Sequence, residues 1–313
     1  MSPGTDRGIA LVLVLWVLTL LTVMAVGMTA AQRTETALTE NHIADARFRA
    51  LTDAAIVYTM FSFLTPPPET TGAELGADAA AGAEDTAWVP NGAPRPLGFD
   101  GNALIIAVYN EQSRINLNLA PAPVLSALMV AVGVEEEEAG SIADAIVDWR
   151  DEDDLKSLNG AEDPDYEDAG QVAGAKDAPF VAVEELQQVL GVTRELYLRL
   201  APEITVDTEN DQVEQSFASA AVLAALQGIP LEEAQLQVQE RDNPSVPGGP
   251  GPRVVNRGGP LYRIQVKEQG AAATARGMEA LVELAPGQTP PYQVRWRRFG
   301  LMSGPPSAAV AAD

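Results

Sequence analysis

The sequence predicts an α+β fold in which a long N-terminal helix packs on a small antiparallel sheet, and a large all-α domain is inserted into that sheet. Three observations predict this order. No helix-breaking residue occurs from Gln32 to Thr65. A single strand pattern then precedes a block of helical patterns, and three strand patterns follow the block. With 313 residues, of which 46% are hydrophobic, the chain can bury a core of this size.

The N-terminus combines a short polar leader, residues 1–8, with the uncharged and mostly apolar segment Ile9–Ala31. At 1.5 Å per residue this segment is about 34 Å long, enough to cross a hydrocarbon core of ~30 Å. A basic residue and a glycine, Arg7-Gly8, stand before the apolar run, an arrangement that prepilin peptidases cut between Gly8 and Ile9. A plain transmembrane anchor and a cleaved secretory signal are alternatives, although the run is long for a signal.

The helix that starts at Ile9 is predicted to continue to Leu64. Pro66-Pro67-Pro68 then ends it, because proline has no amide proton and clashes with the preceding turn. Beyond the apolar segment, apolar residues recur at roughly helical intervals and predict a buried stripe, which consists of Leu38, Ile43, Phe48, Leu51, Ala55 and Tyr58. The whole helix, residues 9–64 with a membrane-spanning part at 9–31, would be ~80 Å long.

The fifth residue after the predicted cleavage point is Leu13. Pilin-like subunits usually carry a glutamate at this position, which pairs with the N-terminal amine of a neighbouring subunit. A carboxylate in lipid is costly unless it is paired. A subunit without it has no neighbouring amine to neutralise, which fits a position at the end of a filament.

The remainder of the chain divides by composition and pattern. Residues 65–96 are rich in Pro, Gly, Ala, Glu and Thr and are predicted to form a linker or loop. Residues 97–114 contain the first strand, at 103–109, and the inserted α-domain spans 115–242. We expect Asn118 to cap its first helix. The C-terminal strands of the sheet occupy residues 243–300, at 262–267, 279–284 and 292–297, and residues 301–313 form a flexible tail.

The α-domain shows weak internal repetition. Residues 124–139 and 222–234 share the order Val-Leu, Ala-Leu, Gly and Glu-Glu-Ala, and residues 184–193 are a candidate third copy. Each copy is predicted to be a helix, a glycine turn and a second helix. Helix-hairpin-helix modules look like this and many bind DNA, so a membrane-anchored DNA receptor is an alternative function. A net charge of −24 and few basic residues at the glycine turns argue against nucleic acid as a partner.

Acidic residues concentrate in the α-domain. Between Gly133 and Gly170 there are 15 acidic residues and two basic ones. Residues 148–166 are predicted to end one helix and form a loop. Alternating carboxylates at Asp151 and Asp153 and a tight return at Gly160 would bring the following carboxylates, Glu162 and Asp163, back toward them. Such a set of oxygen ligands suits Ca²⁺, although the loop lacks the EF-hand pattern, and a solvated acidic face is the alternative.

The sequence offers little for catalysis. There is no cysteine, and the single histidine, His42, falls within the long helix. No nucleophile elbow, phosphate-binding loop or dinucleotide fingerprint occurs. We therefore expect a protein that is not an enzyme; an anchored enzyme would require a nucleophile or metal triad that the sequence does not display.

Several motifs occur together in this chain, and their combination is specific although each part is common. They are Arg7-Gly8-Ile9-Ala10-Leu11-Val12, the segment Arg114–Leu125 (RINLNLAPAPVL), Asp148-Trp149-Arg150-Asp151-Glu152-Asp153 followed by Asn159-Gly160-Ala161-Glu162-Asp163, and Val183–Leu186 with Gly191–Tyr197. Through them nearly the whole chain resembles the minor pseudopilin K family of type II secretion systems, the general secretion pathway protein K family.

The resemblance implies a pilin-like fold interrupted by the α-domain, a place at the tip of a periplasmic pseudopilus, and processing by prepilin peptidase with methylation. It implies partnership with the I and J minor pseudopilins and other pseudopilins, and a single-pass location in the bacterial inner membrane with the globular domain in the periplasm. The absence of an acidic residue at Leu13 agrees with this family, whereas Asp6, which offsets Arg7, departs from it. The resemblance also implies calcium in the α-domain, with ligands among Asp148, Asp151, Asp153, Asn159, Glu162 and Asp163.

Overall fold

The computed structural model describes residues 6–65, 88–99, 101–242, 256–269 and 274–303. The chain falls into two compact units that divide between Val57 and Tyr58, and each is described by itself. The elements occur in the order α1 (Asp6–Leu64), β1 (Arg95–Phe99), β2 (Asn102–Asn110), η1 (Glu111–Ser113), β3 (Ile115–Asn116), α3 (Ala122–Ala131), α4 (Glu136–Arg150), α5 (Asp163–Asp168), η2 (Val183–Gln188), α6 (Arg194–Leu200), β4 (Ile204–Thr205), α7 (Ala220–Gln227), α8 (Leu231–Asp242), β5 (Leu261–Glu268), β6 (Thr274–Leu284) and β7 (Tyr292–Ser303).

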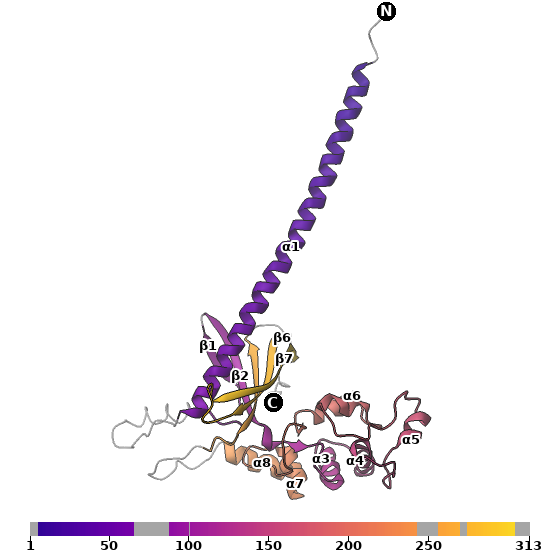
Figure 1. Ribbon diagram of the computed structural model, residues 1–313, viewed down its shortest axis with the longest axis vertical. Helices are drawn as coiled ribbons and strands as arrows, with labels where there is room; N and C mark the ends of the chain where they lie inside the picture. Colours follow the sequence, from indigo (N-terminus) through magenta and orange to yellow (C-terminus); the bar gives the residue numbers. More distant parts are fainter. Residues whose placement is uncertain (1–5, 66–87, 100, 243–255, 270–273, 304–313) are drawn as a thin grey trace, which may run out of the picture. The chain divides into compact units, whose positions relative to one another are not determined.

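Helix α1 is one unbroken helix of 59 residues (Figure 1). It begins three residues before the predicted Ile9 and ends at the predicted Leu64. Burial along it begins later than the predicted stripe. Phe48, Leu51 and Ala55 are buried, but three other members of the stripe are at least 48% exposed, namely Leu38, Ile43 and Tyr58. Helical spacing alone does not reveal at which residue along a helix burial starts.

The sheet has five antiparallel strands in the order β1-β2-β5-β6-β7, and the α-domain is inserted between β2 and β5 (Figure 1). Strand β1 was not predicted, because it contains Pro96 and Gly98, two residue types that are unfavourable within strands. It pairs with β2 across the turn at Gly101, so that Leu97 faces Leu104. Residues 95 and 96 therefore belong to the sheet and not to the predicted linker, and the predicted tail loses residues 301–303 to β7.

The last residues of α1 contribute to the core of the second unit. The Phe63 ring lies 4.7 Å from the Tyr262 ring and 6.5 Å from that of Trp88, measured between centroids. Trp88 is only 9% exposed, so the described part of the predicted linker begins with a buried side chain. Arg257 donates hydrogen bonds to the carbonyls of Ser62 and Thr65, which the end of the helix leaves without intrahelical partners.

The α-domain has its own apolar core, in which α3 packs against both α4 and α7, and α7 also packs against α8. It is not purely helical as predicted, because β3 and β4 form a short parallel ladder that joins Ile115 to Ile204. Asn118 does not cap α3: its side chain exchanges two hydrogen bonds with the backbone of Phe180, and Pro121 stands at the helix start. The Asn118 side chain thus binds a backbone 62 residues away along the chain and not the start of the nearby helix.

The glycines of the first two predicted repeats do end helices. Gly133 has φ +91° and Gly228 has φ +65°, values in the left-handed region that favours glycine. The third candidate differs, since η2 is a 3-10 helix that precedes the turn at Gly191. The geometry therefore supports two helix–turn–helix pairs, and their identity as helix-hairpin-helix modules stays a prediction.

Candidate functional site

The predicted calcium loop is shorter in the structure than in the sequence. Asp148 lies in the last turn of α4, and Asp163 is the first residue of α5. The loop between them covers residues 151–162. Helix α5 thus occupies the end of the segment that was predicted to be a loop, with Pro164 in its first turn, where proline is tolerated because that turn has no intrahelical amide partner.

The buried side chain of Asp148 binds the backbone of the loop. Its side chain is fully buried, and both carboxylate oxygens accept from the amide of Ser157, at 3.2 and 3.1 Å. Gly160 passes directly over this carboxylate. A Cβ at position 160 would lie 1.9 Å from Asp148 Oδ2, so only glycine permits the approach. The tight return that the sequence predicted at Gly160 is present, and it brings Glu162 back toward Asp148.

Three carboxylates near this return hold buried oxygen atoms that have no hydrogen-bond partner among the described residues. These atoms are Asp151 Oδ1, Glu162 Oε1 and Asp177 Oδ1. A buried polar atom without a partner is costly and needs an explanation. For Glu162 no neighbouring lysine or arginine among the described residues compensates the buried oxygen, because the charged groups that act most strongly on it are the carboxylates of Asp148 and Asp151.

The electrostatics of the loop are those of crowded like charges. Burial, followed by repulsion from Asp148 and Asp151, raises the pKa of Glu162 to about 7. Burial, followed by repulsion from Asp153 and Asp148, raises the pKa of Asp151. Burial, followed by repulsion from Asp163 and other carboxylates, raises the pKa of Asp177. In this arrangement, binding of protons or of a cation stabilises the loop relative to the state in which all its carboxylates are ionised.

The remaining predicted ligands lie farther out. Asp153 is exposed and accepts from the amide of Leu155 at 2.9 Å. Asn159 is exposed, and its amide donates to Asp144 at 3.3 Å. Asp163 is exposed too, and it lies against Gly174, where a Cβ would come within 1.7 Å of its Oδ1. The structure therefore gathers Asp148, Asp151 and Glu162 and leaves the other three at the edge.

Asp177 is the residue that sequence reasoning missed. It lies outside the acidic run, in the segment between α5 and η2, and folding brings it to the carboxylates. Its φ is +52°, the left-handed region that a residue other than glycine seldom occupies. Aspartate and asparagine tolerate this region better than most residues. The only signal in the sequence was therefore a single aspartate in a loop, and that signal is weak.

The oxygen atoms of these residues are of the type that a hard cation prefers, but they are not arranged around a common point. Among the described residues, no group of three or more His, Asp or Glu side chains is already arranged around a point as metal ligands. The donors are nevertheless all carboxylate oxygens, and three of them are buried without a partner. Ca²⁺ prefers such oxygens and accepts flexible coordination.

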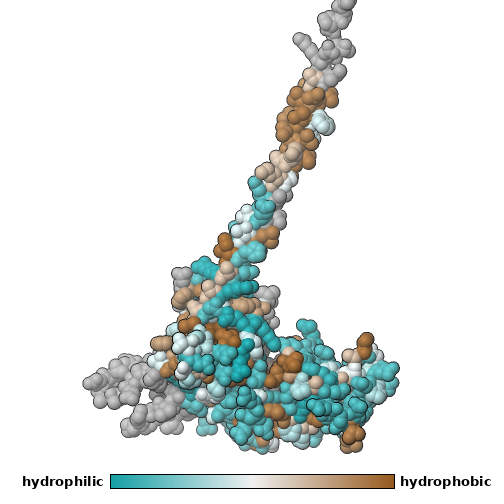
Figure 2. All heavy atoms as spheres, viewed as in Figure 1, coloured by the Kyte–Doolittle hydropathy of each residue, from teal (hydrophilic) through white to brown (hydrophobic). Residues whose placement is uncertain are grey.

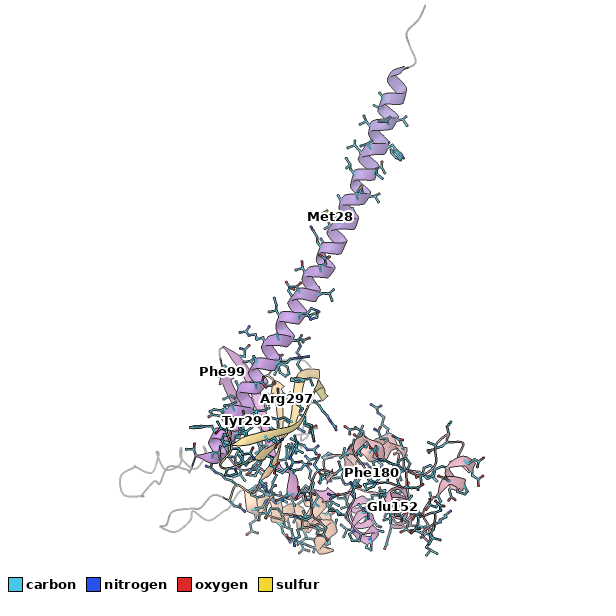
Figure 3. All side chains as sticks on the ribbon, viewed as in Figure 1. Met28, Phe99, Glu152, Phe180, Tyr292 and Arg297 are labelled. Atoms are coloured by element: carbon cyan, nitrogen blue, oxygen red, sulfur yellow. The ribbon has the colours of Figure 1, made fainter. Side chains whose placement is uncertain are left out.

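The second candidate site is the apolar part of α1. Ala10–Thr29, 20 residues of mean hydropathy 2.6, is entirely exposed and long enough to cross a membrane. Figure 2 shows this part of α1 covered by hydrophobic residues, and Figure 3 shows Met28 projecting from it. The hydroxyls of Thr19, Thr22 and Thr29 donate to carbonyls four residues earlier, so they add no unpaired donor.

The backbone of the predicted cleavage point and the fifth residue after it both lie in this helix. Gly8 and Ile9 are in the first turns of α1. Leu13 is 60% exposed, and the other large apolar side chains between Ala10 and Thr29 are exposed as well. A single helix with this surface fits a single-pass anchor followed by a folded domain.

Comparison with known proteins gives a consistent family. A family model described as type II secretion system protein K matches residues 101–208. The type II secretion system protein K of Klebsiella pneumoniae is 30% identical over 262 residues, which cover 75% of each chain. The corresponding protein of Pseudomonas aeruginosa is 27% identical over 257 residues, which cover 75% of this chain and 72% of that one.

Other alignments are shorter. The chain aligns with only 37% of the putative protein K of Escherichia coli K12 and 32% of protein K of Aeromonas hydrophila, at 29% and 37% identity over about a third of its own length. A chain of the crystal structure of the GspK-GspI-GspJ complex from enterotoxigenic E. coli matches with a TM-score of 0.51 and 15% identity over 84% of this chain and 98% of that one, which shows a shared fold. The 30% identity across three quarters of the Klebsiella protein shows that this chain belongs to the type II secretion system protein K family.

Proposed function

We propose that this protein is a non-enzymatic minor pseudopilin that caps the tip of the periplasmic pseudopilus and initiates its assembly, and so supports protein export across the outer membrane. The observation that carries the proposal is the uncovered apolar segment Ala10–Thr29 at the start of an unbroken 59-residue helix. Before assembly, lipid would cover this apolar surface. In a bundle of subunits the same surface packs against equivalent helices.

Two features of this chain support the proposed position at the tip. Leu13 offers no carboxylate to the amine of a subunit above it. The α-domain, inserted between β2 and β5, gives this subunit a bulky head. A subunit with this head and without the carboxylate ends a stack and does not continue one. The I and J minor pseudopilins are the partners we propose, because the structural match comes from a complex of those three proteins.

Calcium would serve the α-domain as a structural ion. Asp148, Asp151 and Glu162 would hold it together with Asp177, and Asp153, Asn159 and Asp163 would complete the set if the loop closes around the ion. The ion would offset the mutual repulsion of these carboxylates and keep the loop folded. It would have no part in any reaction.

The proposal is tested on the full chain in membranes of its native host. Cleavage by prepilin peptidase predicts a mature N-terminus at Ile9, read by N-terminal sequencing. Tip assembly predicts that the detergent-extracted protein co-purifies with the I and J minor pseudopilins. An N-terminus at Met1 or Ser2 without co-purification would show a plain anchor, and it would reopen the receptor and enzyme alternatives.

A further inference from the structure

The α-domain and the sheet meet along a set of polar and charged side chains, which we call the polar seam. On the sheet side it consists of Glu111, Arg263, Trp296 and Arg298, and on the α-domain side of Thr205, Asp207 and Glu184. Strand β7 carries Trp296 and Arg298. Figure 3 labels Tyr292 and Arg297, which belong to the same strand.

Glu111 is the centre of the polar seam. It is fully buried, and Arg263 forms two hydrogen bonds with its carboxylate, one of them 2.7 Å from Nε to Oε2. From the α-domain, the Thr205 hydroxyl donates to Glu111 Oε1 at 2.6 Å. Burial alone would raise the pKa of Glu111, but Arg263 and Arg114 hold it below its ordinary value. The carboxylate is therefore charged and its geometry is defined on both sides.

A second group of contacts crosses the seam beside Glu111. Asp207 follows β4, accepts from the Trp296 indole at 3.2 Å, and lies 3.8 Å from the Arg263 guanidinium. The Arg263 guanidinium also stands over the Trp296 ring, 5.2 Å from its centroid. At the outer end of the seam Arg298 pairs with Glu184 of η2. The side chains on β7 and β5 are thus engaged by two separate segments of the α-domain.

The apolar cores on the two sides are distinct. The core of the α-domain is built from residues between Ile115 and Val238, and among the described residues it takes none from β5, β6 or β7. Apolar packing is not directional, whereas hydrogen bonds and paired charges lose strength when their angles change. An arrangement with separate cores and a polar seam therefore concentrates the angular restraint in a few side chains.

We propose that the polar seam is an orientation lock: it holds the α-domain at one angle on the sheet, and each body keeps its own fold without it. Thr205, Asp207 and Glu184 make the contacts that cross the seam from the α-domain, while the Glu111–Arg263 pair lies on the sheet side and presents the acceptor for Thr205. Loss of the crossing contacts frees the α-domain to rotate about its connection at η1. If the protein caps a filament as proposed, this lock sets the direction in which the cap faces.

The test measures distances between spin labels in the full chain in detergent, by pulsed electron resonance. The chain has no cysteine, so pairs of introduced cysteines label cleanly. Three exposed pairs are compared: Gln293→Cys with Glu137→Cys across the seam, Gln293→Cys with Glu268→Cys within the sheet, and Glu137→Cys with Glu195→Cys within the α-domain. We expect a single narrow distance maximum for each pair in the otherwise unchanged protein.

The variant that combines Thr205→Val, Asp207→Ala and Glu184→Gln removes the crossing contacts of these three side chains and leaves Glu111 paired with Arg263. It should lose the narrow maximum for the cross-seam pair alone. Thr205→Val by itself is measured in parallel as the milder change and should broaden the same pair less. Arg295→Gln is the matched control, because it breaks an ion pair with Glu283 inside the sheet and should leave all three pairs unchanged.

Two results would overturn the proposal. An unchanged cross-seam distribution in both variants would assign the orientation to apolar contacts, such as Phe217 at the Gly258 turn. Broadening of all three pairs in both variants would make the seam part of the general stability of the unit. Neither result bears on the mature N-terminus or on co-purification with partners, so failure of the lock and failure of the proposed function are distinguishable.

Discussion

The substitution Glu162→Gln should stabilise the calcium-free protein and weaken its response to calcium. Glu162 is 6% exposed and faces Asp148, Asp151 and Asp177, so its negative charge is repelled on several sides. The amide of glutamine has nearly the same shape and carries no charge. A residue that served only to solvate the loop would show neither effect.

The magnitude follows from the pKa of Glu162, which is raised from 4.5 to about 7. In that window the folded protein keeps a proton that the unfolded chain has lost, so stability falls as the pH rises from about 4.5 to about 7. Each pKa unit corresponds to ~1.4 kcal/mol, which makes the ionised Glu162 cost up to about 3 kcal/mol at pH 8. The variant avoids this cost and should melt higher, by about 2–4 °C for each kcal/mol.

If calcium binds as proposed, it should reverse the order of the two melting temperatures. An ion that binds only the folded state adds about 2.7 kcal/mol when its concentration is a hundred times the dissociation constant. Wild-type protein should therefore gain more from calcium than the variant, which lacks the charge of the proposed ligand Glu162. The two melting curves should change places between chelator and excess calcium at pH 8, and the wild-type protein should be less pH-dependent with calcium than without.

The assay is thermal unfolding of the full chain in detergent, followed by near-ultraviolet circular dichroism at pH 5 and pH 8, with chelator or with calcium. Trp149 reports on the α-domain, since it is buried in α4 with its ring 5.8 Å from that of Tyr166. Glu167→Gln on the exposed face of α5 is the matched control. Equal melting temperatures for wild-type and Glu162→Gln protein in chelator at pH 8 would refute the reasoning.

Three further predictions follow from individual contacts. Gly160→Ala should abolish the calcium response and lower stability by ~1–3 kcal/mol, because its Cβ would collide with Asp148; calorimetry with and without calcium checks this, and an undiminished calcium response would contradict it. Arg257→Met should lower the free energy of unfolding by ~1–3 kcal/mol through the unpaired carbonyls of Ser62 and Thr65, measured by urea titration, and an unchanged midpoint would refute the capping role. Leu13→Glu should reduce the amount of protein inserted in the membrane, since Leu13 is near the start of the span Ala10–Thr29, where an unpaired carboxylate costs less than the ~2.5–3.5 kcal/mol of the helix centre but is still unfavourable; equal recovery from washed membranes would show that the charge finds a partner there.

The fold was largely readable from the sequence because its elements follow local rules. Helix α1 combines an apolar segment, helical spacing and a run of prolines at its end, and all three signals act within a few residues of one another. Strand β1 was missed for the opposite reason. Its residues have poor strand propensity, and they form a strand because β2 presents a free edge beside them.

The candidate metal centre was readable in part. The sequence identified the acidic loop and the tight return at Gly160, since density of charge and a glycine are both visible along the chain. It did not rank the carboxylates. Asp148 and Glu162 are buried while Asp153 and Asp163 are exposed, and this difference depends on which side of the loop packs on the α-domain.

The sequence by itself determined the apolar N-terminal segment, the family and the order of helix, sheet and inserted domain, because periodicity, composition and short motifs are properties of neighbouring residues. Only the tertiary structure decided that Asp177 joins the acidic loop and that Glu111 is shared between Arg263 and Thr205, partners 152 and 94 residues away along the chain. Such contacts depend on how separate elements pack, and a carboxylate in a sequence does not disclose which distant residues will surround it.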